Sequence, residues 1–195
     1  IVEQEGLEAD DLLGTIAGIG ERAGMDVVIL SGDRDLLQLA TDHVKIRIPK
    51  TKQGKTEIED YYAADVKARY QVTPQEFIDL KALMGDASDN IPGVPSIGEK
   101  TATKIITEYG SVENAYAHVE ELKPPRAAKA LKEHYDKAQM SKILATIEVN
   151  APISYELSEA KIGNLYTGEA YEYFQKLQFK NLLGRFGMWK QREIR

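Results

Sequence analysis

The run MDVVILSG, residues 25–32, is a continuous apolar segment that ends in glycine and is followed at once by Asp33 and Asp35. Such a run without polar alternation is typical of a buried strand in a parallel sheet. The preceding segment, from about Glu8 to Gly24, has apolar residues at helical spacing, and glycine suits a helix end. The order helix, strand, short helix, strand predicts a doubly wound α/β sheet.

A second strand is expected in HVKIRIP, residues 43–49, and TEIED, residues 56–60, is expected to pair back on it across a turn at Gly54. Two or three strands are few for a stable parallel sheet, and Ile1 is not an initiator methionine. We therefore expect the chain to be a fragment that begins inside a larger fold.

From about Tyr61 the pattern becomes helical. Thr73 is an expected N-cap, with proline next to it and a capping-box glutamate, for a helix that ends near Met84. Residues 102–109 have the spacing of an amphipathic helix, and Ser111 is expected to cap the next one. One longer helix is predicted within residues 124–149, and the last helices within residues 168–186.

Charge is distributed unevenly along the chain. The formal net charge is -6, and the absence of cysteine excludes disulfides and thiolate metal sites. Acidic residues dominate residues 1–42, whereas lysine and arginine dominate residues 43–56 and 175–195. This segregation is compatible with a nucleic-acid partner, because binding depends on the local field. No apolar run approaches the roughly 20 residues of a membrane span, so we expect a cytoplasmic protein without a membrane partner.

Seven acidic residues form three groups at the ends of expected elements: Glu8, Asp10 and Asp11; Asp33 and Asp35; Asp86 and Asp89. Each group alone would suit a helix cap or a turn. Ligands of open α/β sheets, however, bind at the carboxyl ends of the strands, where the second group lies. Gathered carboxylates are costly unless a cation neutralises them, and oxygen ligands favour magnesium or manganese.

The segment IPGVPSIGEKTA, residues 91–102, has the pattern of a helix-hairpin-helix motif. A glycine-containing hairpin exposes backbone N–H groups at a helix start, where the helix dipole favours an anion. It can therefore hold one DNA phosphate without reading the base. An ordinary helix end followed by a turn is the alternative, and the GEKTA helix start favours the hairpin. The residues expected to bind DNA here are Gly93, Ser96, Gly98, Lys100, Thr101 and Lys104.

Together these segments resemble the 5'-nuclease domain of bacterial DNA polymerase I, within the flap endonuclease family. The matching stretches are EADDLLGTIA, VVILSGDRDLLQL, KALMGDASDNIPGVPSIGEKTA and LQFKNLLGRF, which occur in family order over essentially the whole chain. The resemblance implies the C-terminal part of a Rossmann-like, PIN-like parallel sheet in residues 1–60. A mostly helical DNA-binding region would follow in residues 61–195, with the helix-hairpin-helix at 74–108 and C-terminal helices that return to the core.

The resemblance implies a two-metal phosphodiesterase that removes 5' flaps and RNA primers from nicked or branched duplex DNA in replication and repair. The implied cofactors are two Mg²⁺, which Mn²⁺ can replace, and K⁺ at the hairpin. A monomer associated with the nucleoid and fused to polymerase domains is expected. By motif, the implied ligands are Glu8, Asp10 and Asp33 for one metal and Asp35, Asp86 and Asp89 for the other, with Asp11 beside them. Catalytic roles are implied for Asp10, Asp33, Asp35 and Lys81, and a phosphate contact for Arg34.

Two departures from the family pattern matter. The family's first strand and its arch precede Ile1, and they carry further acidic ligands and basic residues, so we expect little or no nuclease activity from the isolated chain. Ser96 stands where the family usually has glycine. If this position needs a positive φ, serine costs about 1 kcal/mol and weakens the grip on phosphate without abolishing it.

A nuclease fused to a polymerase has three alternatives. The first is a non-catalytic DNA-binding module, but such a module has no use for several carboxylates that converge near DNA. A small metal-dependent ribonuclease on a related α/β core does not need a helix-hairpin-helix, which grips duplex DNA. A stand-alone 5' nuclease stays open beside the fused one.

Overall fold

The computed structural model describes residues 1–52 and 54–190, and these residues divide into two compact units, one before and one after the bond between Ile153 and Ser154. Within the predicted basic C-terminal segment, Arg192 and Arg195 lie outside the described residues. No helix in the described ranges is long and apolar enough to cross a membrane. The two units are described separately below.

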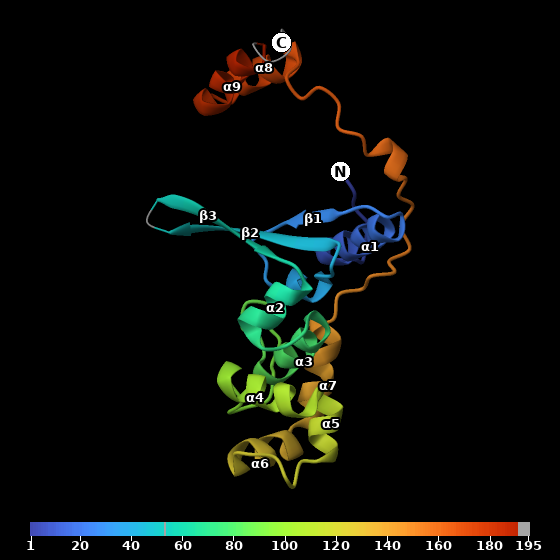
Figure 1. Cartoon of the computed structure of the whole chain (residues 1–195), viewed down its shortest axis with the longest axis vertical. Coiled ribbons are helices and arrows are strands. Elements are labelled where there is room, and N and C mark those ends of the chain that lie inside the picture. Colours follow the sequence, from blue (N-terminus) through green and yellow to red (C-terminus); the bar gives the residue numbers. More distant parts are fainter. Residues whose placement is uncertain (53, 191–195) are drawn as a thin grey trace. The chain divides into compact units, whose positions relative to one another are not determined.

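The first unit contains a mixed sheet (Figure 1). In the described part of the chain the sheet has three strands in the order β1-β2-β3. Strand β1 (Val27–Leu30) pairs in parallel with β2 (Val44–Lys52), which pairs antiparallel with β3 (Lys55–Tyr61). The parallel pair and the hairpin predicted from the sequence are therefore confirmed.

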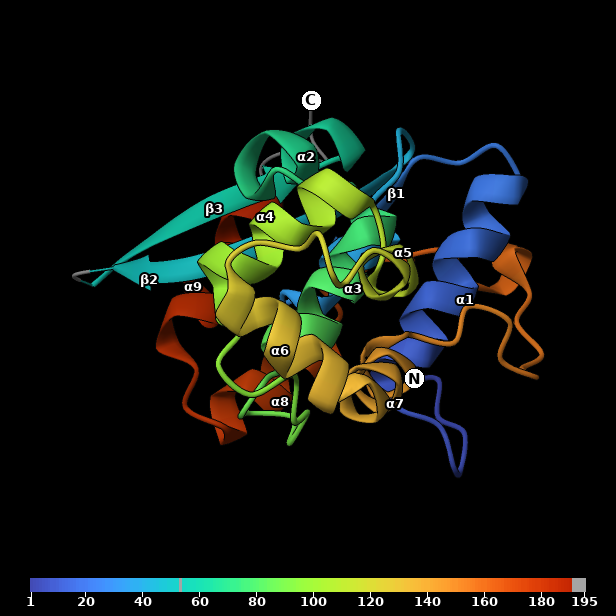
Figure 2. The ribbon, with the colours of Figure 1, turned by 90° about the horizontal axis from the view of Figure 1, so that it is seen from below.

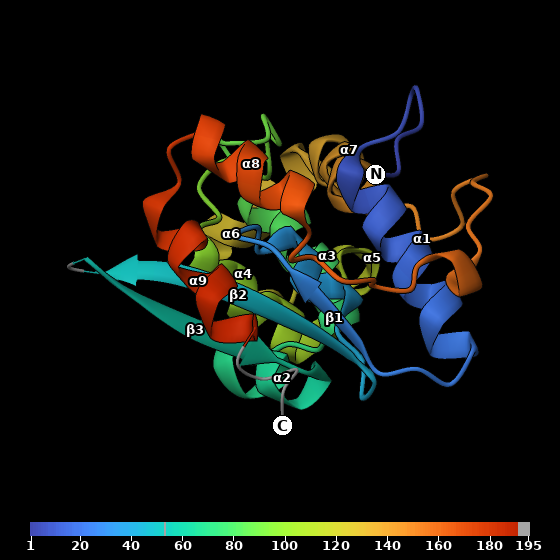
Figure 3. The ribbon, with the colours of Figure 1, turned by 90° about the horizontal axis from the view of Figure 1, so that it is seen from above.

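Helix α1 (Ala9–Arg22) precedes the sheet, and the 3-10 helix η1 (Asp35–Leu39) joins β1 to β2. The helices that follow the sheet in this unit are α2 (Ala63–Tyr70), α3 (Pro74–Met84), α4 (Glu99–Tyr109), α5 (Val112–Ala117), α6 (Pro125–Glu133) and α7 (Tyr135–Ala145). Figure 2, which views the molecule from below, shows α2 to α7 in front of the sheet. In the view from above, these helices lie behind the strands (Figure 3).

This one-sided covering corrects one prediction. Strand β1 was expected to be buried as a whole, but only Ile29 is buried, at 4% exposure, whereas Val28 and Leu30 are 51% and 67% exposed. Successive side chains of a strand point to opposite faces, and the helices of the first unit cover one face. The apolar run therefore forms the predicted strand, with a single buried face.

Local signals set the starts of α3 and α5. The Thr73 hydroxyl accepts a hydrogen bond from the Glu76 amide at 3.2 Å, and the Glu76 carboxylate accepts one from the Thr73 amide at 2.7 Å. This is the predicted capping box, which satisfies two N–H groups that the helix leaves free. Ser111 caps α5 by accepting from the Asn114 amide at 3.1 Å.

The long helix predicted within residues 124–149 is wrong as a single element. The backbone of His134 has φ -132° and ψ 31°, outside the helical region, so this residue ends α6 and precedes α7. Leu131 and Ala138 are both fully buried, one on either side of the break. Two separate helices therefore bury these side chains, and a single continuous helix does not form.

The second unit contains η2 (Leu157–Glu159), α8 (Gly168–Lys176) and α9 (Lys180–Lys190). Thr167 caps α8 by accepting from the Ala170 amide at 3.1 Å. The aromatic rings of Phe174 and Phe186 meet edge to face, with centroids 5.8 Å apart, and join the two helices. The predicted return of these helices to the core stays a prediction.

The loop after α3 folds back on itself through two glycines. Gly85 and Gly93 have φ 73° and 60°, and a Cβ at Gly93 would lie 2.4 Å from the Gly85 nitrogen. The backbones of Asp86 and Ile91 exchange two hydrogen bonds at 2.9 and 2.8 Å. The close backbone approach therefore requires glycine at residue 93 for space as well as for its positive φ.

We predict that Gly93→Ala destabilises the chain by about 2–4 kcal/mol, since the added methyl group must push two backbone segments apart. Gly24→Ala is the matched control, because Gly24 has φ 77° and open space around it, and should cost only about 1 kcal/mol. Urea unfolding of both variants measures the difference. Equal losses would show that the backbone contact contributes nothing beyond the φ angle.

Candidate metal centre and phosphate-binding hairpin

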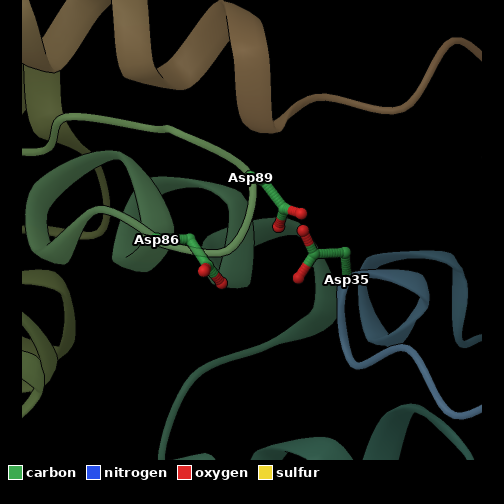
Figure 4. Close-up of side chains that lie close together, drawn as sticks. All are labelled: Asp35, Asp86 and Asp89. Atoms are coloured by element: carbon green, nitrogen blue, oxygen red, sulfur yellow. The ribbon is translucent and has the colours of Figure 1, made fainter.

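Three aspartates from two separate segments meet in the first unit (Figure 4). Asp35 begins η1 just after β1, whereas Asp86 and Asp89 lie in the loop after α3. One carboxylate oxygen from each of the three lies within 4.8 Å of the others. We call this group the aspartate cluster; it contains the three residues assigned by resemblance to the second metal.

The Lys81 side chain reaches the aspartate cluster from α3. Lys81 is only 4% exposed, and its ammonium donates hydrogen bonds to Asp35 Oδ1 and Asp86 Oδ2 and lies 3.7 Å from Asp89 Oδ2. Burial by itself would lower the pKa of Lys81, but the hydrogen bonds to Asp35 and Asp86 raise it above its ordinary value. The same contact holds the pKa of Asp86 well below its usual range. Lys81 is therefore a cation held by carboxylates.

The remaining acidic residues open onto the same region. A groove of about 240 Å³ next to the cluster is lined by Glu8, Asp10, Asp11, Asp33, Asp35 and Asp89. A neighbouring cleft of about 490 Å³ is lined by Asp33, Arg34, Asp35, Lys81, Asp86 and Asp89, among other residues. The three acidic groups picked out in the sequence thus lie around two adjoining hollows that share Asp33, Asp35 and Asp89.

Asp10 in the first turn of α1 has no compensating partner within the described residues. Burial, followed by the charges of Asp33 and Asp35, raises the pKa of its carboxyl to about 6. Burial also raises the pKa of Asp35, although its hydrogen bond to Lys81 acts in the opposite direction. The donors are all carboxylate oxygens, which Mg²⁺ and Mn²⁺ prefer, and a dication would relieve this repulsion. The residues present therefore fit a divalent metal.

Asp11 differs from its neighbours because both of its oxygens already accept hydrogen bonds from the backbone. Oδ2 accepts from the Glu8 amide at 3.1 Å, and Oδ1 accepts from the Glu148 amide at 2.8 Å. These bonds join the start of α1 to the segment after α7. Its visible role in the structure is to hold the rim of the groove in place.

Some supporting residues were missed by the sequence analysis. Ser88 donates its amide, at 2.8 Å, and its hydroxyl to Asp86 Oδ1. Asp33 Oδ1 accepts from the Asp35 amide at 2.9 Å, which orients the Asp33 side chain. The amide contact of Ser88 could have been found, because an aspartate in a turn commonly accepts a hydrogen bond from the backbone two residues on. The amide of Gln38 binds the backbone of residues 145 and 147 at 2.9 and 3.0 Å, and no local signal marks it.

In the hairpin between α3 and α4, Ser96 has φ 72°. This position therefore has the positive φ at which serine is strained. The Ser96 hydroxyl accepts a hydrogen bond from Arg126 Nη2 at 3.1 Å, and Arg126 on α6 is a basic neighbour that the sequence analysis missed. Gly98 is the exposed N-cap of α4. Lys100 and Lys104 are exposed on that helix, and Thr101 is half-buried. The hairpin thus presents positive side chains beside a helix N-terminus.

Gly93 requires a correction. It was expected to offer its amide to a DNA phosphate, but the residue is buried and its N–H donates to the Ser141 hydroxyl at 3.0 Å. Ser141 on α7 is itself fully buried. Gly93 therefore fixes the loop against α7 and has no free amide for DNA. Arg34, in contrast, is exposed at the larger cleft, and its guanidinium has no hydrogen bond or ion pair within the described residues.

The raised pKa of Asp10 gives a pH-dependent prediction. Its folded-state value, about 6, exceeds the ordinary 3.8, so ionisation of Asp10 destabilises the fold above pH 6, and this penalty disappears below pH 3.8. In chelator, Asp10→Asn should therefore be more stable than wild type by about 1 kcal/mol near neutral pH, after allowance for solvent screening. Urea unfolding at both ends of the range tests this. A stability difference that does not change with pH would contradict it.

Comparison with known proteins agrees with this arrangement. A family model described as the 5'-3' exonuclease N-terminal resolvase-like domain matches residues 1–71, and one described as the 5'-3' exonuclease C-terminal SAM fold matches residues 72–167. A solved structure of the bacteriophage T5 D15 flap endonuclease, in a pseudo-enzyme-product complex with DNA and metal ions, is similar with a TM-score of 0.64. It is 28% identical, and the match covers 75% of this chain and 52% of that one.

Two curated relatives are both named DNA polymerase I. The protein of Bacillus caldotenax is 45% identical over 185 residues, which is 93% of this chain and 20% of the relative. The protein of Bacillus subtilis (strain 168) is 43% identical, over 95% of this chain and 21% of the relative. The chain thus spans about a fifth of the length of these relatives. Because the two domain models together match residues 1–167, the chain belongs to the 5'-3' exonuclease family.

Proposed function

We propose that the chain acts in a structure-specific 5'-3' exonuclease and flap endonuclease that hydrolyses DNA phosphodiester bonds with two divalent metals. The observation that carries the proposal is the meeting of three acidic groups around two adjoining hollows, beside a phosphate-binding hairpin. In this proposal residues 1–60 belong to the metal-binding core. Residues 61–195 form the DNA-binding region, with the helix-hairpin-helix at 74–108.

The acidic residues divide between two metals in the proposal. Glu8, Asp10 and Asp33 would hold one metal, and the aspartate cluster the other. Divalent ions in such sites supply an activated water and stabilise charge on the phosphate during in-line displacement. Mg²⁺ is the proposed ion and Mn²⁺ a substitute, since both prefer oxygen donors. Arg34 would bind a phosphate of the DNA, and the exposure of its side chain at the larger cleft supports this role.

The hairpin would hold the duplex at a distance from the metal centre. Ser96 and Gly98 are exposed at the N-terminus of α4, where backbone amides and the helix dipole favour a phosphate. Lys100 and Lys104 would extend this contact along the DNA backbone, with Thr101 beside them. K⁺ held by backbone carbonyls of the hairpin completes the site in the proposal. The positive φ of Ser96 supports weakened, rather than abolished, binding of the phosphate by the hairpin.

The proposed substrate is duplex DNA with a 5' flap or nick, including RNA primers. The T5 neighbour supports this, since it is described as a flap endonuclease in complex with DNA and metal ions. The curated relatives are named DNA polymerase I, so we propose that the natural protein joins this region to polymerase domains. A monomer in the cytoplasm, associated with the nucleoid, is part of the same proposal.

Metal binding provides the first test. Asp86→Asn should weaken Mn²⁺ binding by at least about tenfold, because it removes one charge of the aspartate cluster. Calorimetric titration measures the affinity, and Asp42→Asn, an exposed aspartate before β2, is the control and should bind like wild type. In Mg²⁺, wild type should show at most slow cleavage of a 5'-flap duplex to 5'-phosphate and 3'-hydroxyl ends, and Asp86→Asn should not exceed it. Unchanged Mn²⁺ affinity in Asp86→Asn would refute the metal assignment.

DNA binding is tested separately from metal. Lys100→Ala with Lys104→Ala should lower affinity for duplex DNA and reduce the slope of log K against log salt by about 0.9 for each lost phosphate contact. Fluorescence anisotropy across a KCl series, in chelator, measures both quantities. Lys67→Ala is the control, because Lys67 is an exposed lysine on α2 outside the hairpin. If all variants show the same salt slope, the hairpin lysines do not contact phosphate.

A further inference from the structure

A buried lysine inside an acidic site is unusual enough to need a reason. Lys81 lies on α3 between Leu80 and Leu83, which are 1% and 0% exposed, so its side chain leaves the apolar core to reach the aspartate cluster. A buried ammonium is costly unless hydrogen bonds and opposite charges compensate it. Here Asp35 and Asp86 accept its hydrogen bonds, and Asp89 lies 3.7 Å away. Lys81 is the one ammonium on the cluster in the described part of the chain.

We infer that Lys81 is the resident counter-ion of the aspartate cluster. It holds the three carboxylates together before a divalent cation binds, and its positive charge then limits how tightly that cation is held. The inference rests on the proposed function, because it takes the cluster to be a metal site. It concerns only what Lys81 does toward the metal and is separate from any contact with DNA.

The charges and contacts at the cluster support both parts of this role. Three ionised carboxylates whose oxygens lie within 4.8 Å of one another repel strongly, and one ammonium leaves a net charge of about -2, which suits a dication. Both oxygens of Asp86 are already engaged, Oδ2 by Lys81 and Oδ1 by Ser88. A cation that binds Asp86 must therefore share its carboxylate with Lys81 or displace one of these donors.

Removing the ammonium should consequently have two opposite effects. Without metal, the carboxylates lose their counter-charge, so the fold should be less stable. With metal, the repulsion between ammonium and dication disappears and the Asp86 oxygen is released, so the metal should bind more tightly. A lysine that served only to pack or to close a structural ion pair would produce the first effect without the second.

The chain offers a matched control for this comparison. Lys142 on α7 also bridges two carboxylates, with its ammonium 2.7 Å from Asp79 Oδ1 and 2.8 Å from Glu113 Oε2. Asp79 lies on the same helix as Lys81, and neither of these acids belongs to the aspartate cluster. Lys142→Met should therefore destabilise the fold without changing its response to metal.

The test measures thermal unfolding and calorimetric Mn²⁺ binding of the 195-residue chain as wild type, Lys81→Met and Lys142→Met. In chelator both variants should melt below wild type. Excess Mn²⁺ should raise the melting temperature of Lys81→Met more than that of wild type or Lys142→Met. The dissociation constant of Lys81→Met for Mn²⁺ should be at least about tenfold lower than that of wild type.

If Lys81→Met does not fold in chelator, Mn²⁺ should restore folding, and failure to do so overturns the inference. Equal or weaker Mn²⁺ binding by Lys81→Met than by wild type overturns the inference alone. Absence of Mn²⁺ binding in wild type overturns the proposed metal centre, and the inference with it.

Discussion

The site depends on keeping like charges close together on a rigid support. Asp35 follows a strand, Asp86 and Asp89 follow a helix, and their carboxylates converge although each repels the others. Lys81 opposes this repulsion from inside α3, a helix whose neighbouring residues are buried. Because α3 is anchored in the core, the point from which the Lys81 side chain starts is held in place by that packing. The charge balance of the site is therefore tied to the folding of the helical region.

The same helix also connects the metal centre to the hairpin. The loop after α3 carries Asp86 at its start and turns back so that Gly93 contacts Gly85 backbone to backbone. The Val94 amide donates to the Leu83 carbonyl at 2.8 Å, which fixes the hairpin to the end of α3. The hairpin and the aspartate cluster are thus both tied to the C-terminal end of α3. In a nuclease of this kind, the separation between them would set the distance between the gripped phosphate and the cut.

Strong local signals were sufficient for much of the fold. The β2–β3 hairpin and the capping box at Thr73 rest on residues close in sequence, and both were predicted. The predictions that were wrong concern features set by contacts between segments that are far apart in the sequence. The break at His134 is not marked by proline or glycine, and it was found only in the structure. The exposed face of β1 likewise depends on which elements cover the sheet.

The sequence by itself determined the chemical types at the site, because carboxylates next to a strand end and next to a glycine-rich hairpin permit few interpretations. It also identified the family through motifs whose order and spacing are specific. Only the tertiary structure decided how each group is used: Asp11 binds backbone amides, Gly93 has no free N–H, and Lys81 is surrounded by acids. Hydrogen-bond partners and burial arise from segments far apart in the chain, so local patterns cannot specify them.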